Sequence, residues 1–194
     1  MNTVEPVLRL IIKGIPATAG SKDVKPIWAG KAGDRHPTGR FNVVESPSPA
    51  KQSWRKSVLD EAYAAVRCTC PDPDCTAMRD GFPLDEALVV SFVFTVPKPK
   101  SAPKTIVTYP TARPDALKYG RATEDHMTAG GVLKDDARVV EYGRLAKVYP
   151  NEDPGALPVP GAIVMVWRRS QLPRIPSLVV PSIIAPDSLF EVNA

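Results

Sequence analysis

Carboxylates and cations are concentrated in one stretch of the chain, residues 113–147. Its carboxylates lie at Asp115, at Glu124 and Asp125, and at the pair Asp135–Asp136. Hard cations such as Mg²⁺ are bound in proteins by one or two carboxylates together with waters and substrate phosphate. Cations stand among these carboxylates and suit a polyanionic substrate: Arg113, Lys118, Arg121, Lys134, Arg138 and Lys147. These residue types predict the metal-dependent cleavage of a polyanion.

The local pattern of this stretch predicts a helix followed by a strand. Asp115 follows a proline that restrains the backbone, and its carboxylate can accept hydrogen bonds from the first turn of a helix, as an N-cap does. The helix should end at Gly130–Gly131, because glycine adopts left-handed geometry without strain. The pair Asp135–Asp136 then precedes a run of β-forming residues, 138–142, that predicts a strand. We therefore expect one carboxylate at a helix start and a pair at a strand start.

The spacing of these residues resembles that of the RusA-type Holliday junction resolvases, small Mg²⁺-dependent endonucleases common on phages and prophages. The matching pattern is PD-x-x-K-x-x-R-x-x-x-D, followed by G-V-x-x-DD-x-x-VV and a later lysine. The resemblance is strongest over residues 113–147, extends more weakly upstream, and does not cover the tail beyond about residue 170. It implies an α+β fold and paired cleavage of four-way DNA junctions in recombination and repair. Two symmetric cuts imply a homodimer.

The resemblance also implies roles for individual residues. Asp115 and Asp136 match two metal-binding aspartates of the family, and Asp125 matches an acidic residue further along the helix. Arg121 stands at the position of a catalytic lysine; it keeps the positive charge but cannot donate a proton near neutral pH. We expect Asp115, Arg121, Asp125 and Asp136 to be catalytic, with Mg²⁺ or Mn²⁺ as the cofactor. Four lysines are expected to bind DNA phosphates: Lys98, Lys100, Lys118 and Lys147.

Leu117 departs from the family pattern, which has a third metal-binding aspartate at this position. Glu124 shares the predicted helix face of Leu117 but lies about 10 Å further along the axis. It can ligate only a metal displaced along the helix, which gives a metal set of Asp115, Asp136 and Glu124. The alternative is an inactive site, in a protein that binds branched DNA without cutting it or serves in phage assembly. We expect an active enzyme because the other acidic and basic residues are in place.

Composition and charge set limits on the class of protein. The chain has 194 residues, of which 43% are hydrophobic and 24% charged, and its net charge of +4 permits a nucleic-acid partner without requiring one. No apolar run reaches the length of a membrane span, and the first residues lack the pattern of a signal peptide. We expect no membrane contact and a cytoplasmic location, in the host cytoplasm if a phage encodes the chain. The expected domains are an endonuclease domain over 1–170 and a proline-rich tail over 171–194.

Apolar runs predict the remaining elements. Strands are expected at 7–13, 87–96 and 161–168, and Ser48–Pro49 predicts the start of a helix with an apolar stripe. Residues 14–43 are expected to form a long loop, whose cations suit either a solvated insertion or a basic flap on DNA phosphates. The order of elements predicts an α+β fold, a mixed sheet with packed helices.

Three cysteines lie close together in the sequence, within an expected insertion over 67–84. Thiolates bind zinc well, but the C-x-C-x4-C spacing of Cys68, Cys70 and Cys75 matches no standard zinc finger, and a fourth ligand is missing. A structural disulfide is not expected in a cytoplasmic chain. Two interpretations stay open, a zinc site and an exposed loop with spare thiols.

Overall fold

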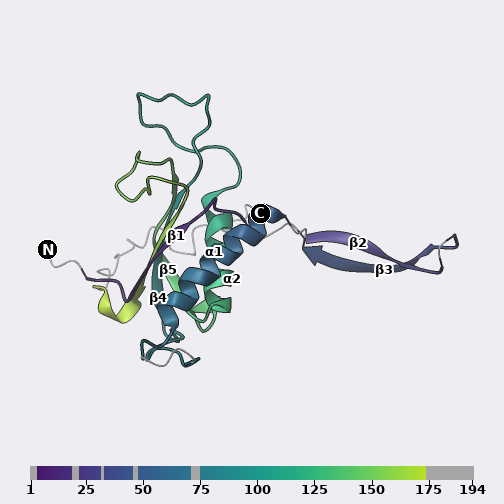
Figure 1. Cartoon of the computed structure of the whole chain (residues 1–194), viewed down its shortest axis with the longest axis horizontal. Coiled ribbons are helices and arrows are strands. Elements are labelled where there is room, and N and C mark those ends of the chain that lie inside the picture. The colour runs from purple at the N-terminus through teal and green to yellow at the C-terminus, as the bar shows by residue number, and fades with distance from the viewer. Residues whose placement is uncertain (1–3, 19–21, 32, 46–47, 71–74, 174–194) are drawn as a thin grey trace, which may run out of the picture.

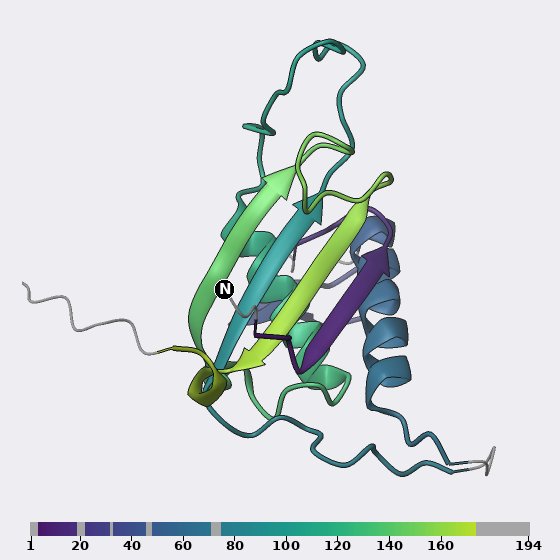
Figure 2. The same ribbon diagram turned by 90° about the vertical axis from the view of Figure 1, so that its left-hand side faces the viewer.

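The computed structural model describes residues 4–18, 22–31, 33–45, 48–70 and 75–173, and within them the chain forms a four-stranded mixed sheet with two helices on one face (Figure 1). The strands lie in the order β1–β6–β4–β5. Figure 2 shows the face of this sheet that carries no helix. The α+β class predicted from the sequence is confirmed. The sheet and its helices comprise β1 (Leu8–Lys13), β4 (Leu88–Thr95), β5 (Val139–Val148), β6 (Gly161–Arg168), α1 (Pro49–Val66) and α2 (Ala116–Ala129).

The predicted central strand is β4, and all of its residues are buried. It pairs parallel with β5 on one side and antiparallel with β6 on the other. A continuous apolar run suits this place because both faces of the strand are covered. The helices cover one face, and the loop before β6 covers part of the other, where the Leu157 N–H donates to Thr95 Oγ1 at 2.9 Å. The strand predicted over 161–168 is confirmed as β6, which lies inside the sheet between β1 and β4.

Helix α1 begins as its sequence predicts. The hydroxyl of Ser48 accepts from the Lys51 N–H at 3.3 Å, and a proline occupies the first turn. The buried members of its apolar stripe recur at helical spacing. Trp54 Nε1 donates to Thr123 Oγ1 in α2 at 3.3 Å, which ties the two helices together inside the core. The buried residues of α1 are Trp54, Val58, Ala62 and Val66.

Helix α2 also has the predicted ends. The carboxylate of Asp115 caps it by accepting from the Lys118 N–H at 2.9 Å. At the other end, Gly131 takes the left-handed conformation with φ of +77°. The preceding Gly130 has no room for a side chain, because an added Cβ would lie 2.5 Å from the Cβ of Ala62. The glycine pair therefore both ends α2 and lets it pack against α1.

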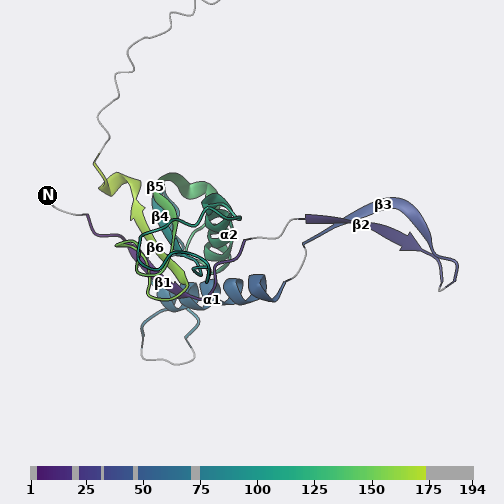
Figure 3. The same cartoon turned by 90° about the horizontal axis from the view of Figure 1, so that it is seen from above.

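The long loop expected over residues 14–43 is wrong for most of that range. The chain there forms an antiparallel hairpin of β2 (Lys22–Ala29) and β3 (His36–Glu45), which extends away from the rest of the molecule (Figures 1 and 3). Pro26 and a register shift beside it interrupt the strand pattern, which explains why alternation did not reveal it. The hairpin exposes large apolar side chains at Val24, Ile27, Trp28 and Phe41.

Two further expectations need correction or fall outside the structure. Asp136 does not start a strand; it opens a short 3-10 helix, η1 (Asp136–Arg138), that precedes β5. A second 3-10 helix, η2 (Arg169–Gln171), follows β6. The proline-rich tail predicted over 171–194 lies outside the described residues from 174 onward. Across the described ranges, no helix has the length and apolar character needed to cross a membrane.

Candidate functional site

Among the carboxylates of residues 113–147, that of Glu124 in α2 is buried. Glu124 is only 5% exposed. Helix α2 approaches the sheet closely because Gly120, one turn earlier, has no side chain; an added Cβ would lie 3.3 Å from Leu145 Cδ1 in β5. This approach brings the carboxylate of Glu124 to Tyr142 of β5, with which it shares a hydrogen bond. The buried Oε1 atom of Glu124, by contrast, has no hydrogen-bond partner among the described residues.

The groups around Glu124 have opposing effects on the pKa of its carboxyl. Burial raises the pKa of the Glu124 carboxyl, and the negative charges of Asp136 and Asp125 raise it further, against the hydrogen bond from Tyr142 and the positive charge of Arg121. Burial and the hydrogen bond to Glu124 in turn raise the pKa of the Tyr142 hydroxyl to about 12. The five residues therefore form one electrostatic group, which we call the Glu124 cluster.

The Glu124 cluster suits a cation. A buried carboxylate oxygen that lacks a partner costs free energy, and a proton or a metal ion would remove that cost. The charge of Asp136 raises the pKa of Glu124, so a second carboxylate acts at this site, and Mg²⁺ uses one or two carboxylates in proteins. The residues present thus fit a metal held by Glu124 and Asp136.

The three-carboxylate metal set expected from the sequence is not assembled. Within the part of the chain that the structure describes, Asp115, Glu124 and Asp136 do not form a group whose oxygens lie within 4.8 Å of one another. Asp115 is instead occupied as the cap of α2 and lies 3.6 Å from the Lys118 amine. The hydrogen bond from the Lys118 N–H lowers the pKa of its carboxyl most, so Asp115 stays ionised.

Asp115 lines a basic pocket at the start of α2. The pocket has a volume of about 650 Å³ and is lined by Arg113, Asp115, Lys118 and Lys147, with their neighbours. The Lys147 amine donates to the Pro114 carbonyl at 2.9 Å and to the Ala112 carbonyl, which fixes it at the pocket wall. Three cations against one carboxylate make this pocket suited to an anion such as a phosphate.

The other predicted residues are placed as follows. Arg121 and Asp125 are exposed on α2 beside Glu124. Leu117, the departure from the family pattern, is 49% exposed on the same helix and offers no ligand. Lys100 is exposed on the long loop between β4 and α2.

Lys98 has a structural partner that the sequence did not predict. Its amine pairs with Glu152 and lies 5.7 Å from the centre of the Tyr149 ring, and its side chain is 19% exposed. Glu152 also accepts from the Thr108 N–H at 3.1 Å, so this carboxylate braces the loop over residues 97–112. That role leaves Lys98 less able to follow a phosphate backbone.

Tyr142 is the member of the cluster that sequence reasoning missed. It was predicted only as a β-forming residue of the strand over 138–142. Its place opposite Glu124 depends on the pairing of β4 and β5, in which Tyr142 lies opposite Val90 and the register shifts at two points. A register that contains such shifts gives no signal in local spacing.

The three cysteines lie close enough to bind a metal. The sulfurs of Cys68, Cys70 and Cys75 are all within 4.8 Å of one another, and they are the one such group of three potential ligands in the described residues. The pKa of the Cys75 thiol is lowered, chiefly by a hydrogen bond with Cys70. The segment that carries them follows α1 and lies at the opposite end of the sheet from the loop over 97–112 (Figure 2).

Comparison with known proteins adds no relative. No model of a protein family matches the chain, and no curated protein matches it.

Proposed function

We propose that the chain is a metal-dependent endonuclease that cleaves branched DNA, with four-way junctions as its substrate. The observation that carries the proposal is the buried carboxylate of Glu124, whose Oε1 lacks a partner among the described residues and whose pKa is raised in part by the charge of Asp136. The RusA-like spacing over residues 113–147 adds the substrate class. The fold is consistent with such an enzyme in its α+β class.

The residues of the cluster have separate roles in this proposal. Glu124 and Asp136 hold the metal ion, Mg²⁺ or Mn²⁺. When bound, that ion supplies an activated water and positive charge for phosphodiester hydrolysis. Arg121 places a fixed positive charge where negative charge develops on the phosphate. Tyr142 keeps the carboxylate of Glu124 oriented by its hydrogen bond.

The basic pocket at the start of α2 is the proposed site for the DNA backbone. Its cations, Arg113, Lys118 and Lys147, can neutralise phosphates without reading sequence. Lys100 on the neighbouring loop extends this positive surface. Cleavage of a four-way junction at two symmetric positions requires two such sites, so the active form is a homodimer.

A second candidate function has its own support. Leu117 stands exposed where the family has a ligand, and the expected set of three carboxylates is not assembled. These observations favour a protein that binds branched DNA without cutting it, or that serves in phage assembly. Binding would then use the same cations.

Cleavage of a labelled four-way junction distinguishes the two functions. We expect purified protein to cut the junction with Mg²⁺ or Mn²⁺, to stop when the metal is chelated, and to leave a linear duplex of the same sequence intact. Binding of the junction without cleavage under any metal condition would favour the second function. Failure to bind branched DNA at all would exclude both DNA-based functions.

A further inference from the structure

The cysteine segment is built around its three sulfurs. Its two arms run antiparallel: the Cys68 N–H donates to the Ala77 carbonyl at 3.0 Å, and the Arg79 N–H donates to the Val66 carbonyl at 2.7 Å. Arg67 and Met78 form an isolated antiparallel bridge between these bonds. This pairing brings Cys75 back to Cys68 and Cys70, so the sulfurs are gathered by backbone hydrogen bonds and not by chance contact on a surface.

The distances between the three sulfurs are compatible with one shared metal ion. In the structure, none of the three cysteines is joined in a disulfide, and all three sulfurs lie within 4.8 Å of one another. Three thiolates on one tetrahedral zinc ion, at about 2.3 Å from the metal, lie roughly 3.8 Å apart. The sulfurs therefore need to move by no more than about 1 Å, a shift that exposed loop side chains make easily.

Backbone donors also favour thiolates here. The Cys70 N–H donates to the Cys68 sulfur at 3.4 Å, and the Ala77 N–H donates to the Cys75 sulfur. In both cases the donor lies two residues after the acceptor. Each arm of the segment thus offers a backbone donor to one of the sulfurs. Hydrogen bonds to sulfur stabilise its charged form, which is the form that binds metals.

We propose that Cys68, Cys70 and Cys75 bind one zinc ion as three thiolates, with water as the fourth ligand. Thiolates are soft ligands that select zinc over magnesium, so zinc at the cysteines and Mg²⁺ at the Glu124 cluster do not compete for the same site. Asp72 and Asp74 lie outside the described residues. The ion joins the two arms of the connection between α1 and β4.

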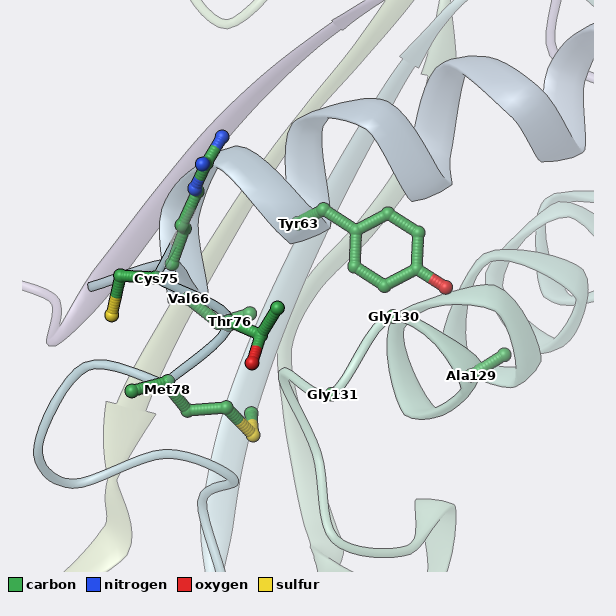
Figure 4. Close-up of a pocket in the computed structure, with 10 residues that line it drawn as sticks. Tyr63, Val66, Cys75, Thr76, Met78, Ala129, Gly130 and Gly131 are labelled. Atoms are coloured by element: carbon green, nitrogen blue, oxygen red, sulfur yellow. The ribbon is translucent and has the colours of Figure 1, made fainter. Parts of the chain in front are cut away.

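The position of Met78 gives this ion a structural consequence. Met78 Cε lies 2.8 Å from where a Cβ on Gly131 would stand, so the segment packs directly on the turn that ends α2. The same segment and turn line a pocket of about 550 Å³ with Tyr63 and Val66 (Figure 4). The sulfur of Cys75 points away from the Tyr63 ring in this view. A zinc ion on the three sulfurs would therefore stabilise a segment that lines this pocket.

Metal content and thiol reactivity test the proposal independently of nuclease activity. We expect full-length protein, purified with reductant and without added metal, to contain about one zinc ion per chain. Single variants Cys68→Ser, Cys70→Ser and Cys75→Ser should each lose nearly all of it. Thr69→Ser and Thr76→Ser, which change neighbouring residues and no thiol, are the matched controls and should keep it.

A thiol assay on the wild-type protein covers the case in which the serine variants fail to fold. The chain has three cysteines, so strong chelation should convert three slowly reacting thiols into three rapidly reacting ones. Zinc well below one per chain in the wild type, zinc retained by the variants, another metal in its place, or a single reactive thiol from a disulfide would each overturn the proposal. If the wild-type protein contains zinc but does not cleave the junction, the proposed nuclease function is contradicted and the zinc site is not.

Discussion

Neighbouring groups have opposing effects on the pKa of the Glu124 carboxyl. Burial and two neighbouring aspartates disfavour its charge, while Tyr142 and Arg121 favour it. An ordinary surface glutamate is not subject to such opposing effects. Burying a carboxylate whose Oε1 lacks a partner in the described structure adds nothing to the stability of the fold. Titratable groups whose pKa is shifted by burial and by neighbouring charges gather at functional sites, where a bound ligand can offset these unfavourable interactions.

Glu124→Gln should raise the free energy of unfolding at neutral pH. The pKa of Glu124 is raised in the folded state, so the folded protein binds more protons than the unfolded chain above the ordinary value of 4.5, and stability is lost as pH rises through the folded pKa. The variant removes this loss, so its advantage over wild type should grow as the pH rises above 4.5. Urea unfolding in chelator measures it. An exposed control, Glu61→Gln, should follow wild type, and a Glu124→Gln curve parallel to wild type would contradict the prediction.

At the scale of elements, local sequence signals predicted helix ends and a buried strand, whereas the pairing of distant segments could not be predicted. The caps at Ser48 and Asp115, the glycine end of α2 and the buried strand β4 were all predictable, because each follows from residues within one turn or one strand. The hairpin of β2 and β3 was not, since its strands are interrupted and bury no core. Four of the five residues of the Glu124 cluster were candidates from the sequence: Arg121, Glu124, Asp125 and Asp136. Tyr142 was not, because its place depends on the register of the sheet.

Deletion of the hairpin should leave the fold intact. Strands β2 and β3 pair with each other and not with the main sheet, so replacing residues 22–45 by a short linker removes no part of the core. Its exposed cations should, however, contribute to DNA binding: Lys25, Lys31, Arg35 and Arg40. We expect an unchanged thermal midpoint and weaker junction binding. A large fall in the midpoint would show that the hairpin belongs to the core, and unchanged affinity would remove it from the DNA surface.

Gly130→Ala should destabilise the contact between α1 and α2. An added Cβ would lie 2.5 Å from Ala62 Cβ, a distance that requires the helices to shift. We expect a loss of about 2 kcal/mol in the free energy of unfolding, as for other overpacked sites. The neighbouring exposed substitution Ala129→Ser is the control and should change it by less than about 0.5 kcal/mol. Equal stability of the two variants would mean that the helices can separate at no cost.

At the scale of the whole molecule, a two-layer body carries two projections. The loop over residues 97–112 rises beyond one end of the sheet, and the hairpin extends from the side (Figures 1 and 2). Both carry exposed cations, and the basic pocket lies where the loop meets α2. The net charge of +4 is small, so DNA binding depends on where these cations stand and not on the overall charge.

Salt should weaken junction binding steeply. If the pocket, the loop and the hairpin together contact several phosphates, raising salt from about 50 to 200 mM should reduce affinity by orders of magnitude. Fluorescence anisotropy with a labelled junction, in the absence of divalent metal, measures the slope. The double variant Lys118→Gln with Lys147→Gln should bind less tightly and with a shallower slope. An affinity independent of salt would exclude the proposed phosphate contacts.

The most direct test of the Glu124 cluster is single-turnover cleavage of a four-way junction in Mg²⁺ by wild type, Glu124→Gln and Glu61→Gln, each at saturating protein. We expect that wild type cuts the junction and that Glu61→Gln cuts it within about twofold of the wild-type rate. Glu124→Gln should bind the junction but cut it at least about 100-fold more slowly. Cleavage by Glu124→Gln at the wild-type rate would show that the buried carboxylate takes no part in the reaction.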